Sequence, residues 1–209
     1  MPVLLRKNIN EDSQLAIWEI SESVDELTKI YHADEHETAT LNSFTHENRK
    51  AQWLAVRILL HELKPGEKIK YDENGKPWPK NSNCYISVSH SGPMVAIYVC
   101  NSACGIDIEH IRPKIERIAP RFLNESELTD AKKDPAVERM HTYWCVKEAA
   151  YKVNGKKSVS LRENIHVHPF SNANKGETTV EVNSSDNSFV TLTSFERHGE
   201  YMLAWTQVK

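Results

Sequence analysis

Apolar and polar positions alternate with a period of two in several parts of the chain, a pattern typical of β-strands with one buried face. Residues 85–90 alternate in this way, and residues 94–99, beyond a turn at 91–93, are almost continuously apolar. Such a pair predicts a hairpin whose second arm is buried on both faces. Further strands are predicted at 15–20, 103–108, 164–168, 178–182, 189–195 and 201–206.

Apolar positions spaced by three and four predict a long helix from Thr45, its expected N-cap, to His61, ended by residues 64–66. A second long helix is expected to open with Asp134 as N-cap and Pro135 as first helical residue, and to close at 154–155. Both predictions rest on residue types that begin or end helices.

Residues 24–30 predict the start of another helical stretch, and residues 74–77 predict a turn. No linker or low-complexity tract divides the chain. Strands and helices are mixed in both of its halves, so the fold class is expected to be α+β or mixed α/β.

The composition is that of an ordinary globular protein, with 39% hydrophobic and 26% charged residues in a chain of 209. A net charge of -3 gives no global positive field that would gather nucleic acid or an anionic membrane. The apolar start is too short for a signal peptide, and no segment approaches the ~18 apolar residues of a membrane span. We therefore expect a cytoplasmic protein with neither nucleic acid nor membrane as partner.

The chain has four cysteines, and nothing in the sequence marks it as a secreted protein that needs disulfides. Two of them are four residues apart, unlike the usual Cys-x-x-Cys spacing of metal ligands, and no second pair completes a set of four. Free, buried thiols are therefore expected at these positions: Cys84, Cys100, Cys104 and Cys145.

Two short segments carry the candidate chemistry. In the first, residues 105–109, Asp107 and Glu109 are two apart on a predicted strand, so their carboxylates share one face and can converge on a cation. A half-buried strand with a solvated acidic face explains the same two residues, because surface acids are common.

In the second segment, residues 144–152, Glu148 and Lys152 are four apart on a predicted helix and share one face. A surface ion pair is the alternative. Three carboxylates that met without a cation would repel one another, whereas Mg²⁺ prefers oxygen ligands and removes that cost. The two segments together therefore favour a magnesium site.

Both segments resemble the signatures of the 4′-phosphopantetheinyl transferases, which read Gly-Ile/Val-Asp-x-Glu and Trp/Phe-x-x-Lys-Glu-Ala/Ser-x-x-Lys. Gly75-Lys76-Pro77 and Ser89-His90-Ser91 are similar to two further motifs of that family, in the expected order. The resemblance spans roughly residues 45 to 155. Cys145 and Ser87 depart from it, since Ser or Thr and often Asn stand at these positions in the family.

The chain's length resembles that of the surfactin-synthetase-activating type, a monomer of two similar α/β halves related by pseudo-twofold symmetry. This resemblance implies an N-terminal half, 1–103, that contacts the nucleotide of coenzyme A, and a C-terminal half, 104–209, that carries the metal ligands and the catalytic helix. The active site is then expected between the halves.

The resemblance implies an Mg²⁺-dependent transfer, with Mn²⁺ as a possible substitute, of the phosphopantetheine arm of coenzyme A to a serine of an apo carrier protein, which releases 3′,5′-ADP. The expected metal ligands are Asp107, Glu109 and Glu148. Glu148 is also the expected base, directly or through water, and Lys152 is expected to contact the pyrophosphate and assist the departing phosphate. Lys147 is a weaker candidate for the same duty.

For coenzyme A itself, the resemblance implies contacts at Ser89, His90, Lys76 and Pro77. Arg49 is the first candidate for the 3′-phosphate and Arg57 the second, because guanidinium groups fork onto phosphate oxygens. Solvation at the surface explains either arginine as well. The carrier, whether acyl, aryl or peptidyl, is not specified by any motif.

A different class of function is a non-catalytic module that binds coenzyme A or a carrier domain. The presence of all three carboxylates and of the helix lysine argues against it. A hydrolase built on Ser89 and His90 is disfavoured, because neighbouring strand residues point to opposite faces.

Overall fold

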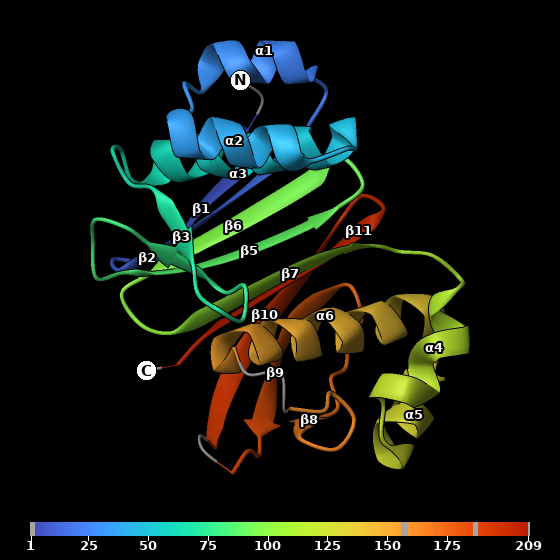
Figure 1. Cartoon of the computed structure of the whole chain (residues 1–209). Helices are drawn as coiled ribbons and strands as arrows, with labels where there is room; N and C mark the ends of the chain where they lie inside the picture. Colours follow the sequence, from blue (N-terminus) through green and yellow to red (C-terminus); the bar gives the residue numbers. More distant parts are fainter. Residues whose placement is uncertain (1–2, 156–158, 186–187, 209) are drawn as a thin grey trace.

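The computed structural model describes residues 3–155, 159–185 and 188–208, which form two halves with one main sheet each (Figure 1). The strand order is β1-β2-β6-β5 in the first sheet and β7-β11-β10-β9-β8 in the second, and adjacent strands in both sheets are antiparallel. None of the helices in these residues is both long and apolar enough to cross a membrane.

The N-terminal half runs from the first strand to the hairpin that the alternating pattern predicts. Its elements are β1 (Val3–Asn10), β2 (Ser13–Glu19), α1 (Val24–Ile30), α2 (Glu35–Ser43), α3 (Glu47–Leu63), β3 (Ile69–Tyr71), β4 (Pro77–Pro79), β5 (Tyr85–Ser91) and β6 (Met94–Cys100). Helix α3 packs on one face of the sheet through a shared apolar core. Every residue of β6 is buried and the strand lies inside the sheet, as the continuous apolar run predicts.

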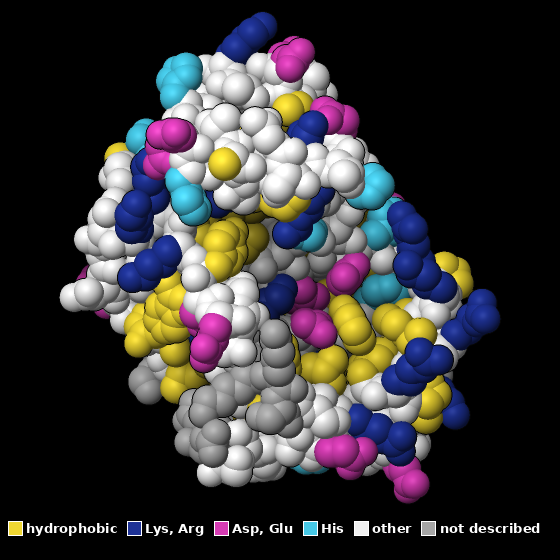
Figure 2. Space-filling view, viewed as in Figure 1, with side chains coloured by type: hydrophobic (Ala, Val, Ile, Leu, Met, Phe, Trp, Pro, Cys, Tyr) yellow, Lys and Arg dark blue, Asp and Glu magenta, His cyan; other side chains and the backbone are white. Residues whose placement is uncertain are grey.

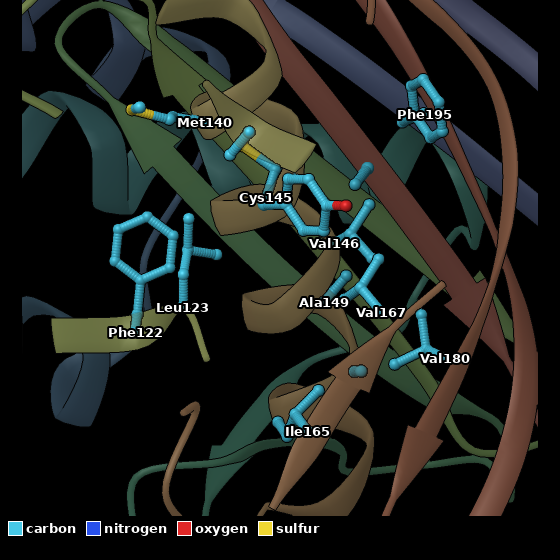
Figure 3. Packing of buried hydrophobic residues seen from close by; sticks show 14 of the residues in the cluster. Phe122, Leu123, Met140, Cys145, Val146, Ala149, Ile165, Val167, Val180 and Phe195 are labelled. Atoms are coloured by element: carbon cyan, nitrogen blue, oxygen red, sulfur yellow. The ribbon is translucent and has the colours of Figure 1, made fainter. Parts of the chain in front are cut away.

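The C-terminal half begins with the strand of the first candidate segment. Its elements are β7 (Cys104–His110), α4 (Ile115–Phe122), α5 (Glu125–Ala131), α6 (Ala136–Asn154), β8 (Ile165–Val167), β9 (Lys175–Val182), β10 (Phe189–His198) and β11 (Tyr201–Gln207). Helix α6 lies across one face of the sheet, and Figure 3 shows Cys145, Val146 and Ala149 of this helix among side chains of the strands.

The two halves repeat one connectivity. In each, a strand leads to a long helix and then to a hairpin, and the first strand pairs with the last strand of that hairpin: β2, α3, β5 and β6 in one half, and β7, α6, β10 and β11 in the other. The α+β class and the prediction of two similar halves are confirmed.

A third apolar core joins the halves, because the faces of the two sheets that point away from α3 and α6 pack against each other. Its members come from β2 and β6 on one side and from β7 and β11 on the other, and include Ile17, Tyr98, Ile106 and Leu203. All four cysteines are buried and free, which confirms the prediction from their spacing.

Two predicted helix starts are each wrong by one residue. Helix α3 begins at Glu47 with His46 as a cap residue that makes no side-chain hydrogen bond, so Thr45 is not the N-cap. Helix α6 begins at Ala136, and Pro135 takes the cap position that Asp134 was expected to hold. In both cases the preferred capping side chain stands just outside a helix that packing against the sheet holds in place.

Helix α2 was not predicted, although a clear signal starts it. The carboxylate of Asp34 accepts the Glu37 backbone N–H at 2.9 Å, and Glu37 in turn accepts the Asp34 backbone N–H at 3.2 Å. This reciprocal capping box offsets an apolar pattern too weak to identify the helix.

Gly105 sets the distance between β7 and α6. A Cβ atom at this position would lie 1.8 Å from the carbonyl oxygen of Ala149, so only glycine allows the strand and helix to approach this closely. The backbone oxygen cannot swing away as a side chain does, and the helix itself must move to admit a methyl group.

We expect Gly105→Ala to lower the free energy of unfolding by about 3 kcal/mol, the upper part of the usual range for overpacking. Urea denaturation measures this loss. Gly176→Ala is the matched control, because its Cβ would meet only the Phe195 ring, at 3.1 Å, and we expect a loss of about 1 kcal/mol or less. Equal losses in the two variants would contradict the role given to Gly105.

Candidate active site

The strand and helix of the two candidate segments face each other. Lys152 of α6 places its Nζ 2.7 Å from Oδ1 of Asp107 and 2.8 Å from the backbone oxygen of Ile106 on β7. Gly105 makes this possible, because the helix lies directly against the strand two residues before Asp107. The structure thus places the two segments in one cluster.

Asp107 is held by one carboxylate oxygen only. It is 4% exposed, and its Oδ1 accepts hydrogen bonds from Lys152 and from the Ser89 hydroxyl, the latter at 2.7 Å. Its Oδ2 is buried and has no hydrogen-bond partner. A buried carboxylate oxygen without a partner is costly unless a cation or a proton donor meets it.

Glu109 and Glu148 lie close enough to Asp107 for its charge to shift their pKa values. Burial, opposed by a hydrogen bond from Ser91 and reinforced by Asp107, raises the pKa of Glu109 above its ordinary value. Burial, with smaller contributions from Asp107 and Glu109, raises the pKa of Glu148 to about 7. Lys152 opposes both shifts. The cluster therefore carries more negative charge than its one lysine balances.

These three residues fit a hard divalent cation. The orphaned oxygen of Asp107 and the raised pKa values show donors whose charge the protein itself does not satisfy. Within residues 3–155, 159–185 and 188–208, no three such side chains already stand in ligating geometry.

Two adjoining hollows form a groove that begins beside Lys152 of this cluster and continues along the N-terminal half. The first, about 220 Å³, is bordered by Lys152 and Tyr151 of α6, and the second, about 160 Å³, by Arg49 and His90. Both are lined by the same three residues, Gly75, Pro77 and Val88. Figure 2 shows acidic side chains gathered in the hollowed middle of this face of the molecule.

In the second hollow, the guanidinium of Arg49 on α3 contacts Nε2 of His90 at the end of β5. Burial first and the charge of Arg49 second lower the pKa of His90, so its ring is neutral near pH 7. A neutral imidazole that accepts from an arginine leaves the other guanidinium donors available to an anion.

Arg57, the second candidate for the 3′-phosphate, also lines the second hollow, but its guanidinium is already engaged within the N-terminal half. It is 5% exposed, forms an ion pair with Glu37 at 3.4 Å, and stacks on the Trp53 ring at 3.2 Å. Its charge is already balanced inside the N-terminal half, so the arrangement favours Arg49.

Two of the residues expected to contact coenzyme A have additional partners. Lys76 donates from Nζ to the backbone oxygen of Val153 at 2.9 Å, near the end of α6, and burial lowers its pKa. Ser89 is 8% exposed and uses its hydroxyl on Asp107. Pro77 lines both hollows, as a contact to a bound nucleotide requires.

Lys147 does not lie in the candidate site, so its expected contact with the pyrophosphate is wrong. Its side chain is fully buried in the C-terminal half, with Nζ 2.7 Å from Oε2 of Glu127 and 2.8 Å from the backbone oxygen of Leu161. One residue along a helix turns a side chain by about 100°, which carries Lys147 away from the face of Glu148 and into the core.

Sequence reasoning missed Ser91 as a member of the site. Its hydroxyl donates to Oε2 of Glu109 at 2.8 Å and accepts the backbone N–H of His110 at 3.2 Å. The available signal was its place at the end of β5, two residues after Ser89 and on the same face of the strand. Cys145, a departure from the family pattern, is buried in the core and lines neither hollow, but it lies close enough to Asp107 and Glu109 that, after burial, both raise the pKa of its thiol.

Comparisons with known proteins agree with the geometry. The family model of the 4′-phosphopantetheinyl transferase superfamily matches residues 103–206. The 4′-phosphopantetheinyl transferase psf-1 of Bacillus pumilus is 37% identical over 110 residues, which cover 48% of this chain and 47% of that protein. AcpT of Escherichia coli K12, also named a 4′-phosphopantetheinyl transferase, is 32% identical over 115 residues, which cover 51% of this chain and 59% of that protein.

The chain thus spans about half the length of the curated relatives it matches. Among solved structures, the holo-[acyl-carrier-protein] synthase of Thermotoga maritima is similar over 50% of this chain and 61% of its own, with a TM-score of 0.41 and 23% identity.

The two lysines of α6 allow a direct test of the site. We expect Lys147→Met to cost about 3 kcal/mol or more of unfolding free energy, because it leaves the buried Glu127 carboxylate without its cation. Lys152→Met is expected to cost less stability and to weaken coenzyme A binding. Thermal denaturation and calorimetric titration with coenzyme A measure the two effects. A Lys147→Met protein of unchanged stability and weakened binding would restore Lys147 to the site.

Proposed function

The chain belongs, through residues 103–206, to the 4′-phosphopantetheinyl transferase superfamily, and we propose that it transfers the phosphopantetheine arm of coenzyme A to a serine of an apo carrier protein. The observation that supports this most is the cluster of Asp107, Glu109, Glu148 and Lys152 beside two adjoining hollows, the second of which holds Arg49. The reaction needs a site for a pyrophosphate with its cation and a site for a 3′-phosphate.

Asp107, Glu109 and Glu148 are the residues that would hold Mg²⁺, or Mn²⁺ in its place. The bound ion supplies charge neutralisation to the pyrophosphate of coenzyme A. Burial and mutual repulsion raise the pKa values of Glu109 and Glu148, which means that their charged forms lack a balancing positive charge. A positive charge lowers these pKa values again, which is a favourable contribution to its binding.

Glu148 is the proposed base. Its carboxylate can accept the proton of an approaching serine hydroxyl, directly or through a water molecule. Lys152, beside Asp107, neutralises the phosphate that departs with 3′,5′-ADP. The serine oxygen forms a bond to the phosphorus of the arm as the bond to the nucleotide's phosphate breaks.

Arg49 and His90 are proposed to bind the 3′-phosphate of coenzyme A, with Lys76 and Pro77 along the nucleotide. Arg49, His90 and Pro77 line the second hollow and Lys76 lines the first, which supports this assignment. The identity of the carrier follows from surface complementarity and not from these residues. The monomeric state and the cytoplasmic location remain predictions from the sequence and the family resemblance.

The alternative, a module that binds coenzyme A or a carrier domain without catalysis, predicts the groove and the arginine but gives no reason for three repelling carboxylates. Burying such a cluster costs stability that a simple binding protein gains nothing from. The charged end of the groove therefore favours the transferase.

We expect the protein, with coenzyme A and Mg²⁺, to add one phosphopantetheine arm to an apo carrier protein, detected as a mass increase by mass spectrometry. Glu148→Gln should lower kcat about 10²–10⁴-fold, the usual contribution of a general base. Glu62→Gln, an exposed glutamate of α3, is the matched control and should retain full activity. No transfer to any acyl, aryl or peptidyl carrier in a panel would refute the proposal.

A further inference from the structure

Three serines of β5 connect the two halves of the protein. Ser87, Ser89 and Ser91 alternate along the strand, so their side chains share the face that points toward β7. Strands β5 and β7 are the edges of different sheets and are not paired by a backbone ladder. The serine hydroxyls supply hydrogen bonds between them.

The three hydroxyls contact β7 at positions that advance along that strand in the same order as the serines advance along β5. The two strands therefore run in the same direction. The Ser87 hydroxyl accepts the backbone N–H of Ile106 at 3.0 Å. Ser89 donates to Asp107 at 2.7 Å, and Ser91 donates to Glu109 at 2.8 Å. The first serine thus binds the backbone only, whereas the next two bind the carboxylates of the candidate metal site.

Ser89 and Ser91 each hold one oxygen of their carboxylate and leave the other without a partner. Oδ1 of Asp107 accepts from Ser89 and from Lys152, while Oδ2 is buried and unpartnered. Oε2 of Glu109 accepts from Ser91, and across the described parts of the chain no hydrogen bond is recorded to its Oε1. Each carboxylate therefore has one oxygen that is held by a serine and one that is not, and Asp107 also lies beside the buried Cys145 thiol.

The orientation of Ser91 is fixed from two sides. Its oxygen accepts the backbone N–H of His110 while its proton is donated to Glu109, so the hydroxyl cannot rotate away without losing both hydrogen bonds. A carboxylate held in this way resists turning to offer both oxygens to one ion. Ser89, which is 8% exposed, is likewise enclosed.

We propose that Ser89 and Ser91 are positioning residues that make Asp107 and Glu109 single-oxygen ligands and so favour a small octahedral cation such as Mg²⁺ over Ca²⁺. Mg²⁺ requires about six ligands in strict geometry, whereas Ca²⁺ takes more oxygens and accepts carboxylates through both of them. Releasing a carboxylate from its serine removes a restraint that penalises Ca²⁺ more than Mg²⁺. This inference rests on the metal site of the proposed function.

The test compares Ser91→Thr with Ser91→Val, which have the same shape and differ in the hydroxyl. Full-length proteins are titrated with MgCl₂ and with CaCl₂, without coenzyme A, and the rise of the melting temperature gives the affinity. We expect Ser91→Thr to behave as wild type and Ser91→Val to bind Mg²⁺ about tenfold more weakly, as is usual when a residue that orients a ligand is lost. The Ca²⁺ affinity should fall by less than about threefold.

Ser87→Ala is the control for a purely structural effect, because Ser87 joins the same strands but touches no carboxylate. It should lower the melting temperature without changing the preference for Mg²⁺. If Ser91→Val does not fold, the pair Ser89→Thr and Ser89→Val is expected to give the same difference. Equal Mg²⁺ affinities in the Thr and Val variants, an equal loss for both cations, or no Mg²⁺ binding by the wild type would overturn the proposal.

The outcome is independent of arm transfer, which is measured separately on the wild-type protein. Transfer by the wild type together with unchanged cation preference in the Val variants overturns the role of the serines alone. A changed preference without transfer to any carrier overturns the proposed function alone.

Discussion

The close approach of β7 and α6 is the constraint on which the site depends. A strand carboxylate and a helix lysine meet at 2.7 Å because Gly105 leaves room for the carbonyl of Ala149, where a Cβ atom would lie 1.8 Å away. Any larger residue moves the helix outward and with it Lys152 and Glu148. The same glycine therefore determines both the packing of the C-terminal core and the distance between the groups that carry the proposed chemistry.

That approach has an electrostatic cost. It gathers Asp107, Glu109 and Glu148 in a half-buried place with Lys152 as the nearby cation, and burial with mutual repulsion raises the pKa of Glu148 to about 7. In the rest of the C-terminal half, buried charges are closely matched, as in the pair of Lys147 and Glu127 at 2.7 Å. Unmatched negative charge at one place of an otherwise balanced protein is what a cation-dependent phosphoryl transfer requires.

Periodicity and residue type were enough to predict the strand of Asp107, the helix of Glu148 and the hairpin of β5 and β6, because each pattern reports one element and one face. They did not separate Lys147 from Lys152. Both lysines lie on the same helix. Only the position of α5, which brings Glu127 to the core, shows that Lys147 forms a buried ion pair there. The roles of Arg57 and Ser91 likewise depend on partners distant in sequence, Glu37 and Glu109 respectively.

The candidate metal site would involve both halves, although its proposed ligands all lie in the second. The family model covers residues 103–206, which include Asp107, Glu109 and Glu148 but not the strand whose hydroxyls hold two of these carboxylates. Side-chain hydrogen bonds replace a backbone ladder between β5 and β7, and they tie Asp107 and Glu109 to the neighbouring half by one oxygen each. A shift of the halves relative to each other would therefore change the direction in which the remaining carboxylate oxygens point. The arrangement of the halves thus also determines the geometry that these two carboxylates offer to a cation.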